Sequence, residues 1–215
     1  EEIGLEELSG YKAHAIKSGQ THIVAEDDED ALNKAKELLS FFPSNNKEKP
    51  PRIEIKDDPE RATSDLDTLV PEQQYQPFDM NEMIKKIVDE GYFFEIMGLH
   101  ARNMITGFAR FNGRPVGIIA NQPMWAAGCI DIDAADKGAR FIRFCDSFNI
   151  PLISLQDCPG YMIGSEQDWR GILRHGAKLL FAWADATGPG ICALKAKPSG
   201  GAHYGMLDKA IGADF

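Results

Sequence analysis

The sequence predicts a layered α/β domain, because short apolar runs that suit strands alternate with longer segments of helical periodicity. Residues 104–111 and 116–120 are rich in β-forming side chains, and Asn112-Gly113 between them is a strong hairpin signal. Apolar runs at 151–155 and 190–194 follow segments of helical spacing at 134–148 and 168–186. Strand–helix–strand units of these lengths predict crossovers between parallel strands.

The first 78 residues have a different character. Residues 21–25 suggest a strand, and the acidic run at 26–30 favours a helix start, because carboxylates suit the positive end of a helix. Residues 43–78 are rich in proline and charge, with little apolar periodicity, and are typical of a linker. Asp79 can cap a following amphipathic helix. We therefore expect three parts: residues 1–42, a linker at 43–78, and residues 79–215.

Composition excludes several classes of function. The net charge of −10 argues against a nucleic-acid partner, since phosphate binding needs an excess of Lys and Arg, and it gives no reason to expect a membrane surface. The four cysteines show no zinc-like spacing, so we expect no metal site and a reduced, cytoplasmic setting. No signal peptide or spanning segment is visible, and the missing initiator Met suggests a piece of a longer polypeptide.

The first chemical motif is Pro159-Gly160-Tyr161, which follows the strand expected at 151–155. A Pro-Gly pair forces a sharp turn, and such a turn can point backbone N–H groups at a ligand beyond the end of the strand. Taken alone, an ordinary strand-ending turn explains the motif better.

The second motif is Ser199-Gly200-Gly201-Ala202, after the strand expected at 190–194. If a helix starts at Ala202 or His203, its first N–H groups lack partners and form an anion site. Alone, this motif too is more typical of a connecting loop. Together, the two turns could converge on one oxygen that develops negative charge, as in an oxyanion hole. The sequence offers no convincing nucleophile or base beside them, which suits chemistry in which a cofactor moves the proton.

A third feature is a set of cations expected on one helix face, Arg170, Arg174 and Lys178. They could approach an anionic ligand, although a solvated face is the commoner explanation. His175 on the same helix is more typical of a hydrogen-bonded structural residue than of a catalyst.

Six stretches carry a resemblance to a known family. They are Phe-Phe-Glu-Ile at 93–96, Gly-Phe-Ala-Arg at 107–110, Asn-Gly-Arg-Pro-Val-Gly at 112–117, Gly-Ala-Arg-Phe-Ile-Arg-Phe-Cys-Asp at 138–146, Phe-Asn-Ile-Pro-Leu-Ile at 148–153 and Arg-His-Gly-Ala-Lys-Leu-Leu at 174–180. In this order they resemble biotin-dependent acyl-CoA carboxyltransferases: the β subunits of propionyl-CoA and acetyl-CoA carboxylases, and the α subunits of glutaconyl-CoA and methylmalonyl-CoA decarboxylases.

The resemblance implies a crotonase-like fold of ββα units, duplicated in the full-length family. Residues 1–42 would end the N-terminal, acyl-CoA-binding half, and residues 79–215 would begin the C-terminal, biotin-binding half. In the family, carboxybiotin releases CO2, the biotin enolate takes the α-proton of the acyl-CoA, and the substrate enolate attacks CO2.

The resemblance also implies site residues and partners. The N–H groups of Gly201 and Ala202 would hold the biotin ureido oxygen together with Gly200, and the turn at Pro159, Gly160 and Tyr161 would supply an opposing donor. Biotin would arrive on a carrier protein loaded by a biotin carboxylase. The family's active site lies between halves of different subunits, which implies a homo-oligomer built from dimers, such as a hexamer, and an inactive fragment.

Three positions depart from the carboxylase pattern. The usual Phe after Pro-Gly is Tyr161 here, which is a mild change. Where carboxylases commonly have Tyr-Asp after Gly-Gly-Ala, this chain has His203-Tyr204, a run similar to glutaconyl-CoA decarboxylases, whose transfer is coupled to a sodium pump. Tyr204 stands where the family selects the acyl group, so a short-chain substrate is in question. We favour the carboxylase, with the decarboxylase, and the membrane partner it implies, as the alternative.

Two other classes remain open. A cofactor-free hydratase or hydrolase of the same fold would need a carboxylate beside the donors, for which Glu166 and Asp168 are the nearby candidates. An assembly module would use the turns as scaffold only and would tolerate a bulky residue at Gly201.

Overall fold

A computed structural model describes residues 2–71, 73 and 76–215. Within these residues the chain forms a five-stranded sheet in the order β1-β2-β3-β4-β5. The strands are β1 (Phe94–Ile96), β2 (Met104–Phe111), β3 (Arg114–Asn121), β4 (Leu152–Cys158) and β5 (Gly190–Pro198). The pairs β1–β2 and β2–β3 are antiparallel, whereas β3–β4 and β4–β5 are parallel. The predicted α/β layering, hairpin and parallel crossovers are therefore confirmed.

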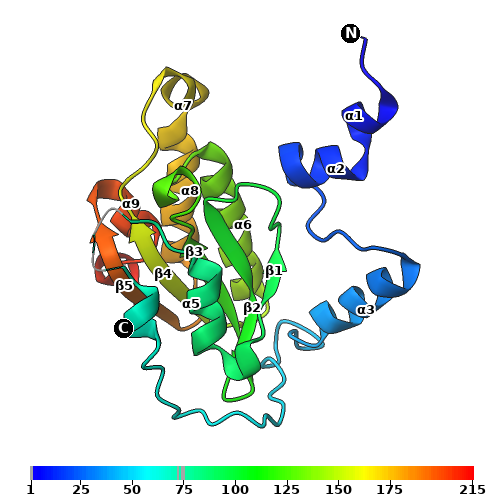
Figure 1. Cartoon of the computed structure of the whole chain (residues 1–215), viewed down its shortest axis with the longest axis vertical. Coiled ribbons are helices and arrows are strands. Elements are labelled where there is room, and N and C mark those ends of the chain that lie inside the picture. The colour runs from blue at the N-terminus through cyan, green and yellow to red at the C-terminus, as the bar shows by residue number, and fades with distance from the viewer. Residues whose placement is uncertain (1, 72, 74–75) are drawn as a thin grey trace.

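Helices cover both faces of this sheet (Figure 1). The crossover helices α6 (Ile132–Ser147) and α8 (Ile172–Asp185) pack together on one face, while α5 (Met80–Ile87) lies on the other. Side chains alternate along each strand, so Ile119 of β3 belongs to the core under α6 and α8, and Ile118 belongs to the core under α5. Both neighbours are fully buried.

Carboxylates cap the starts of several helices, and the predicted cap at Asp79 is confirmed. Asp79 accepts a hydrogen bond from the N–H of Asn81 at the start of α5, and Asp131 accepts one from Ala134 at the start of α6. Asp27 caps α3 (Asp28–Leu39) in the same way, through the N–H of Asp30.

Two predicted elements are wrong. Residues 21–25 form no strand, because their backbone has no ladder partner; the N–H of Met97 donates to the carbonyl oxygen of His22 as a single contact. The single helix expected over 168–186 is broken into α7 (Ser165–Arg170) and α8. Gly171 between them has a φ of 89°, a left-handed conformation that ends α7 and redirects the chain.

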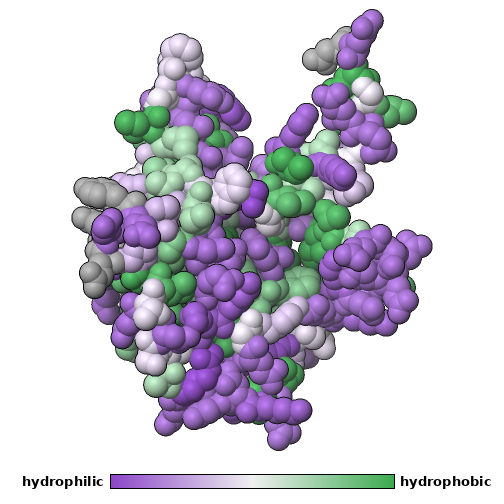
Figure 2. All heavy atoms as spheres, in the orientation of Figure 1, coloured by the Kyte–Doolittle hydropathy of each residue, from purple (hydrophilic) through white to green (hydrophobic). Residues whose placement is uncertain are grey.

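The N-terminal arm, residues 2–42, projects from the sheet and carries α1 (Leu5–Ser9), α2 (Tyr11–Ala13), a π-helical turn (His14–Ser18) and α3 (Figure 1). Figure 2 shows apolar surface where this arm meets the body. At its end Phe41 is buried, and its ring stacks on Phe108 of β2 with centroids 5.5 Å apart. The arm is thus joined to the main core at its last residues.

The segment between arm and body, which includes the short helix α4 (Leu66–Leu69), lies against the sheet domain. The Arg61 guanidinium donates to the carbonyl oxygens of Lys86 and Val88, at 2.7 and 2.8 Å. The N–H of Ile53 donates to Gly113 in the hairpin turn. Polar contacts of this kind fix an extended segment that has little apolar pattern of its own.

Candidate functional site

Two turns meet beyond the carboxyl ends of two neighbouring strands, β4 and β5. Since β4 and β5 are parallel, their carboxyl ends lie side by side, and Pro159-Gly160 follows β4 while Ser199 and α9 (Gly200–Gly205) follow β5. Tyr161 reaches across, so that a Cβ placed on Gly201 would lie 3.7 Å from its ring. The structure therefore brings together the two motifs that the sequence separates by about forty residues.

Helix α9 presents backbone donors at its first turn. It begins at Gly200, two residues earlier than the sequence suggested, so Gly201 and Ala202 are its second and third residues. Gly200 has a φ of 55°, which favours glycine, and no heavy atom lies within 4 Å of its Cβ position. The first N–H groups of any helix lack carbonyl partners within it, and the side chain of Ser199 does not cap this one.

The other end of α9 is fixed by buried side chains. The Trp183 indole N–H donates to the carbonyl oxygen of Gly205 at 3.0 Å, and the Ser154 hydroxyl donates to that of Met206. Trp183 comes from α8 and Ser154 from β4, and both are buried. The carbonyl end of α9 is thereby satisfied within the fold, while its N–H end stays available to a ligand.

Tyr161 holds the opposite turn in place. Its hydroxyl donates to the carbonyl oxygen of Gly176 in α8 at 3.2 Å, and burial raises the pKa of this phenol to about 12. The bridge between Ile130 and Tyr161 uses the N–H groups of Ile130 and Met162 and leaves the Tyr161 N–H pointing away from it. Tyr161 thus offers its backbone, while its side chain serves packing.

Two polar residues beside α9, Gln156 and Asp208, were not found from the sequence, and both contact His203. The His203 Nδ1 lies 3.0 Å from Gln156 Oε1, and its Nε2 lies 2.6 Å from Asp208 Oδ2. Gln156 is fully buried on β4, and Asp208 follows α9. Tyr204, the candidate substrate residue, is 45% exposed on the outer side of α9, with its ring centroid 5.8 Å from that of His203.

A buried carboxylate, Asp157, lies at the same end of the sheet but on the face opposite to α9. Asp157 is 2% exposed, and its Oδ2 lies 3.7 Å from the Lys195 ammonium, which stands over the Phe78 ring at 4.4 Å. Gln156 contacts His203 of α9, whereas the Lys195 partner of Asp157 stands over Phe78, which belongs to the core under α5. The Asp157–Lys195 pair therefore lies under the α5 face and away from α9.

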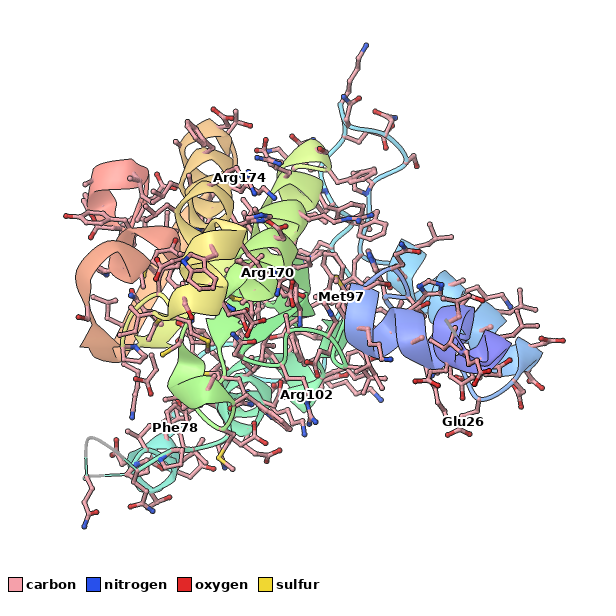
Figure 3. All side chains as sticks on the ribbon, turned by 90° about the horizontal axis from the view of Figure 1, so that it is seen from above. Glu26, Phe78, Met97, Arg102, Arg170 and Arg174 are labelled. Atoms are coloured by element: carbon pink, nitrogen blue, oxygen red, sulfur yellow. The ribbon has the colours of Figure 1, made fainter. Side chains whose placement is uncertain are left out.

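The expected cationic stripe is divided between local partners. The break at Gly171 separates Arg170 in α7 from Arg174 in α8, both labelled in Figure 3. Arg170 pairs with Glu166 at 3.3 Å, and Lys178 pairs with Asp136 at 2.6 Å. The stripe therefore behaves as a solvated helix face.

His175 and the candidate carboxylates have structural or exposed positions. His175 Nδ1 lies 2.9 Å from Asp136 Oδ2, so it joins α8 to α6 as expected of a structural histidine. Glu166 and Asp168, the carboxylates that a hydratase would need, are exposed in the first turn of α7.

A separate cavity of about 210 Å³ lies between the arm and the body. Leu38, Phe108 and Phe144 line it together with Lys137 and Arg140. The Lys137 ammonium already donates to backbone carbonyl oxygens, among them those of Met97 and Met104 at 2.9 and 2.6 Å. Its hydrogen-bonding capacity is therefore used inside the fold.

Comparison with known proteins decides the family. A family model described as the carboxyl transferase domain matches residues 1–215. The chain belongs to this family. Its relatives include the methylmalonyl-CoA decarboxylase subunit alpha of Veillonella parvula, 46% identical, and the propionyl-CoA carboxylase carboxyltransferase subunit of Haloferax mediterranei, 47% identical. Each match covers 100% of this chain and 42% of the relative, so the chain spans less than half of their length.

The fold agrees with this family. The crystal structure of transcarboxylase 12S, described as a hexamer assembly with methylmalonyl-coenzyme A and methylmalonic acid bound, superposes with a TM-score of 0.97 at 46% identity. It matches 100% of this chain, which covers 42% of that one. The crotonase-like α/β fold expected from the resemblance is thus confirmed.

Across residues 2–71, 73 and 76–215, no group of three or more His, Cys, Asp or Glu side chains could hold a metal ion. Within the same described ranges, no helix combines the length and the apolar character needed to cross a bilayer.

Proposed function

We propose that this chain supplies the biotin-binding part of an acyl-CoA carboxyltransferase. Membership of the carboxyl transferase family supports the reaction class. The single observation that supports the site is the meeting of two strand-ending turns beside an uncapped helix start, with Gly201 packed near the Tyr161 ring. Residues 1–42 would then belong to the acyl-CoA half, residues 43–78 to the connection, and residues 79–215 to the biotin half.

The residues present fit a biotin ureido group. When bound, biotin supplies a carboxyl-carrying ureido ring whose oxygen gains negative charge as the carboxyl group leaves. The N–H groups of Gly201 and Ala202 can donate to such an oxygen, with Gly200 keeping the approach open. Pro159 and Gly160 carry the opposing turn, in which the Tyr161 N–H is the candidate second donor.

The chain's own contribution is a preorganised set of donors. Trp183 and Ser154 fix α9 from below, and Tyr161 fixes the facing turn, so the donors need not reorganise when charge develops. Donors of this kind typically each contribute about 10²–10³ in rate. Of the carboxylates at this end of the sheet, Asp208 pairs with His203 and Asp157 with Lys195.

The proposal includes partners and setting. A biotin carrier protein and a biotin carboxylase would deliver the carboxyl group, acyl-CoA would accept it, and a homo-oligomer would complete the site. We assign no metal to this subunit. A cytoplasmic location stays a prediction.

A decarboxylase is the second candidate. The His203-Tyr204 pair and the 46% identity to a methylmalonyl-CoA decarboxylase subunit favour it. Such an enzyme would run the transfer toward biotin, with Tyr204 on the outer side of α9 beside the acyl group.

The test uses the full-length protein with free biotin and malonyl-, methylmalonyl- or glutaconyl-CoA. Biotin-dependent transfer from malonyl-CoA supports the first candidate, and transfer from glutaconyl-CoA alone supports the second. Transfer from methylmalonyl-CoA is expected of both and establishes the shared reaction class. Gly201→Val should lose about 10²-fold in transfer while keeping its melting temperature, because a branched side chain would enter the donor turn. Gly201→Ala is the matched control. A Gly201→Val protein with the full transfer rate would contradict the assignment and favour a scaffold role.

A further inference from the structure

His203 joins three separate parts of the chain at the base of the donor turn. It follows Ala202 directly, and its two ring nitrogens contact Gln156 of β4 and Asp208 beyond α9. Its side chain is largely enclosed, at 24% exposure, and that of Asp208 is 20% exposed. This position differs from that of a surface histidine.

Both partners of His203 are themselves fixed. Gln156 is fully buried on β4, an inner strand of the sheet. Asp208 uses its other oxygen, Oδ1, to accept a hydrogen bond from the Ala210 N–H at 2.7 Å, which caps the 3-10 turn Lys209–Ile211. His203 therefore connects α9 to two anchored groups on opposite sides.

The ring chemistry suits a clamp. A carboxylate only accepts hydrogen bonds, so the Nε2 that faces Asp208 carries a proton. Nδ1 lies within hydrogen-bonding distance of the Gln156 side-chain amide, 3.0 Å from Oε1. Hydrogen bonds to charged groups are stronger than neutral ones, so the Asp208 contact holds the ring firmly.

A helix of this length needs such contacts. Helix α9 has six residues, and short helices are held in proteins by tertiary packing rather than by their own hydrogen bonds. Trp183 and Ser154 hold the backbone at its last residues, whereas His203 lies next to the Gly201 and Ala202 donors. The orientation of the donor turn thus depends on this side chain.

We propose that His203 is a positioning residue that fixes the Gly201–Ala202 donors by joining α9 to Gln156 and Asp208. The inference rests on the proposed function, because it gives the donors their role in transfer. Misplacement of a catalytic group by about 1 Å can cost about 10²-fold in rate. His203 would hold the donors in position through α9, without itself touching the reacting groups.

The experiment measures position and rate separately in the full-length protein. Amide exchange over residues 199–208, read by mass spectrometry, reports α9 directly, because the N–H groups of Met206 and Leu207 bond to carbonyls within it. Biotin-dependent transfer, with kcat and KM determined for the acyl-CoA, reports the donors. The variants are His203→Ala, His203→Gln, Asp208→Ala and the double variant His203→Ala with Asp208→Ala.

We expect His203→Ala to exchange these amides about tenfold faster and to lower kcat between about tenfold and 10²-fold with KM unchanged. His203→Gln, which can still donate toward Asp208, should recover part of both effects. The double variant should lower kcat no further than His203→Ala, because His203→Ala already removes the contact through which Asp208 reaches α9, and the Asp208 cap on Lys209–Ile211 lies beyond the donors. His175→Ala is the matched control: it removes another His–Asp pair, from the α6–α8 contact, and should leave exchange over 199–208 unchanged.

Two results would overturn the inference: unchanged exchange in His203→Ala, or faster exchange with unaltered kcat. Absence of any biotin-dependent transfer by the wild-type protein is a different result, since it would refute the proposed function while the exchange data still decide whether His203 holds α9.

Discussion

Tyr161 fills the space that two glycines leave between α8 and α9. A Cβ on Gly176 would lie 2.8 Å from the ring carbon Cε1, and a Cβ on Gly205 would lie 2.5 Å from the hydroxyl oxygen. Contacts this short force a shift, so both positions need glycine for close packing rather than for an unusual backbone angle. The two contacts differ, however, in the part of Tyr161 that they meet.

That difference predicts which substitution can be rescued. Gly205→Ala should destabilise the protein by about 1–3 kcal/mol through overpacking, and Tyr161→Phe should restore most of the loss by removing the clashing hydroxyl. Gly176→Ala meets the ring itself, so Tyr161→Phe should not rescue it. Melting temperatures of the two glycine variants, alone and combined with Tyr161→Phe, check this against wild type and Tyr161→Phe as references. Equal rescue of both glycine variants would contradict the packing described.

Tyr161 also predicts a pH dependence. Its pKa is raised by burial to about 12, above the ordinary value of about 10. The folded state therefore keeps a proton that the unfolded state loses, and the stability from this group is complete below about pH 10 and lost as the pH rises through about 12. Urea denaturation of wild type and Tyr161→Phe over this window should show a steeper fall for wild type. Parallel curves would show that the phenol titrates normally.

The candidate site was predictable only where residues adjacent in sequence form it. Pro159-Gly160 and Gly200-Gly201 are visible as turns after strands, and their convergence follows from parallel pairing. The contact of His203 with Gln156 spans 47 positions, and a histidine carries no signal of its partner. Lys137 is similar: composition places lysine outside, whereas this one is 2% exposed and is solvated by carbonyl oxygens.

Among the elements, the β2–β3 hairpin shows how a loop is fixed by a residue far from it in sequence. Asn112 and Gly113 both have positive φ, at 52° and 73°, as a type I′ turn requires. The two oxygens of Asp89 accept hydrogen bonds from their N–H groups, at 3.0 and 2.8 Å. A Cβ on Gly113 would lie 2.0 Å from the Ile53 carbonyl oxygen, so the turn also excludes a side chain there.

Removal of this carboxylate should destabilise the hairpin. Asp89 is buried, and Asp89→Ala would leave two N–H groups without partners, at a cost of about 2–4 kcal/mol. Asp89→Asn keeps one acceptor and should lose less. Urea denaturation gives the free energies of unfolding. A loss below about 0.5 kcal/mol for Asp89→Ala would mean that water replaces the carboxylate.

The elements that sequence reasoning missed were decided by tertiary contacts. Residues 168–186 have continuous helical spacing, and a single glycine is tolerated inside a helix, so nothing local revealed the break at Gly171. Residues 21–25 have β-forming side chains but meet no neighbouring strand. Hairpins and caps depend on adjacent residues and were predicted correctly, as at Asp79 and Asn112-Gly113.

At the scale of the whole molecule, large apolar side chains lie exposed around the break between α7 and α8. Ile163, Trp169 and Leu173 are between 85% and 90% exposed. Exposed apolar patches on such a scale mark interaction surfaces. They lie in or next to α7, which stands beyond the sheet at the top of the body in Figure 1.

We expect this surface to lie in the contact between subunits. Trp169→Glu should lower the molar mass of the full-length protein in solution, measured by light scattering after size exclusion, because a charge would enter an apolar contact. Asp168→Asn is the matched control, because it changes the charge of the neighbouring residue and leaves the apolar side chain of Trp169 in place. An unchanged mass for Trp169→Glu would place the contact elsewhere.

The order of the strands has a consequence for how the protein is made. Each strand pairs with the one that precedes it in the chain, so the sheet runs from β1 to β5 in the order of synthesis. A ribosome releases the β1–β2–β3 meander first, and its pairings are local and quick to form. The free edge of β3 can then receive β4, and β4 can receive β5, as each emerges. Growth by addition at one edge requires no strand to insert between two that have already paired.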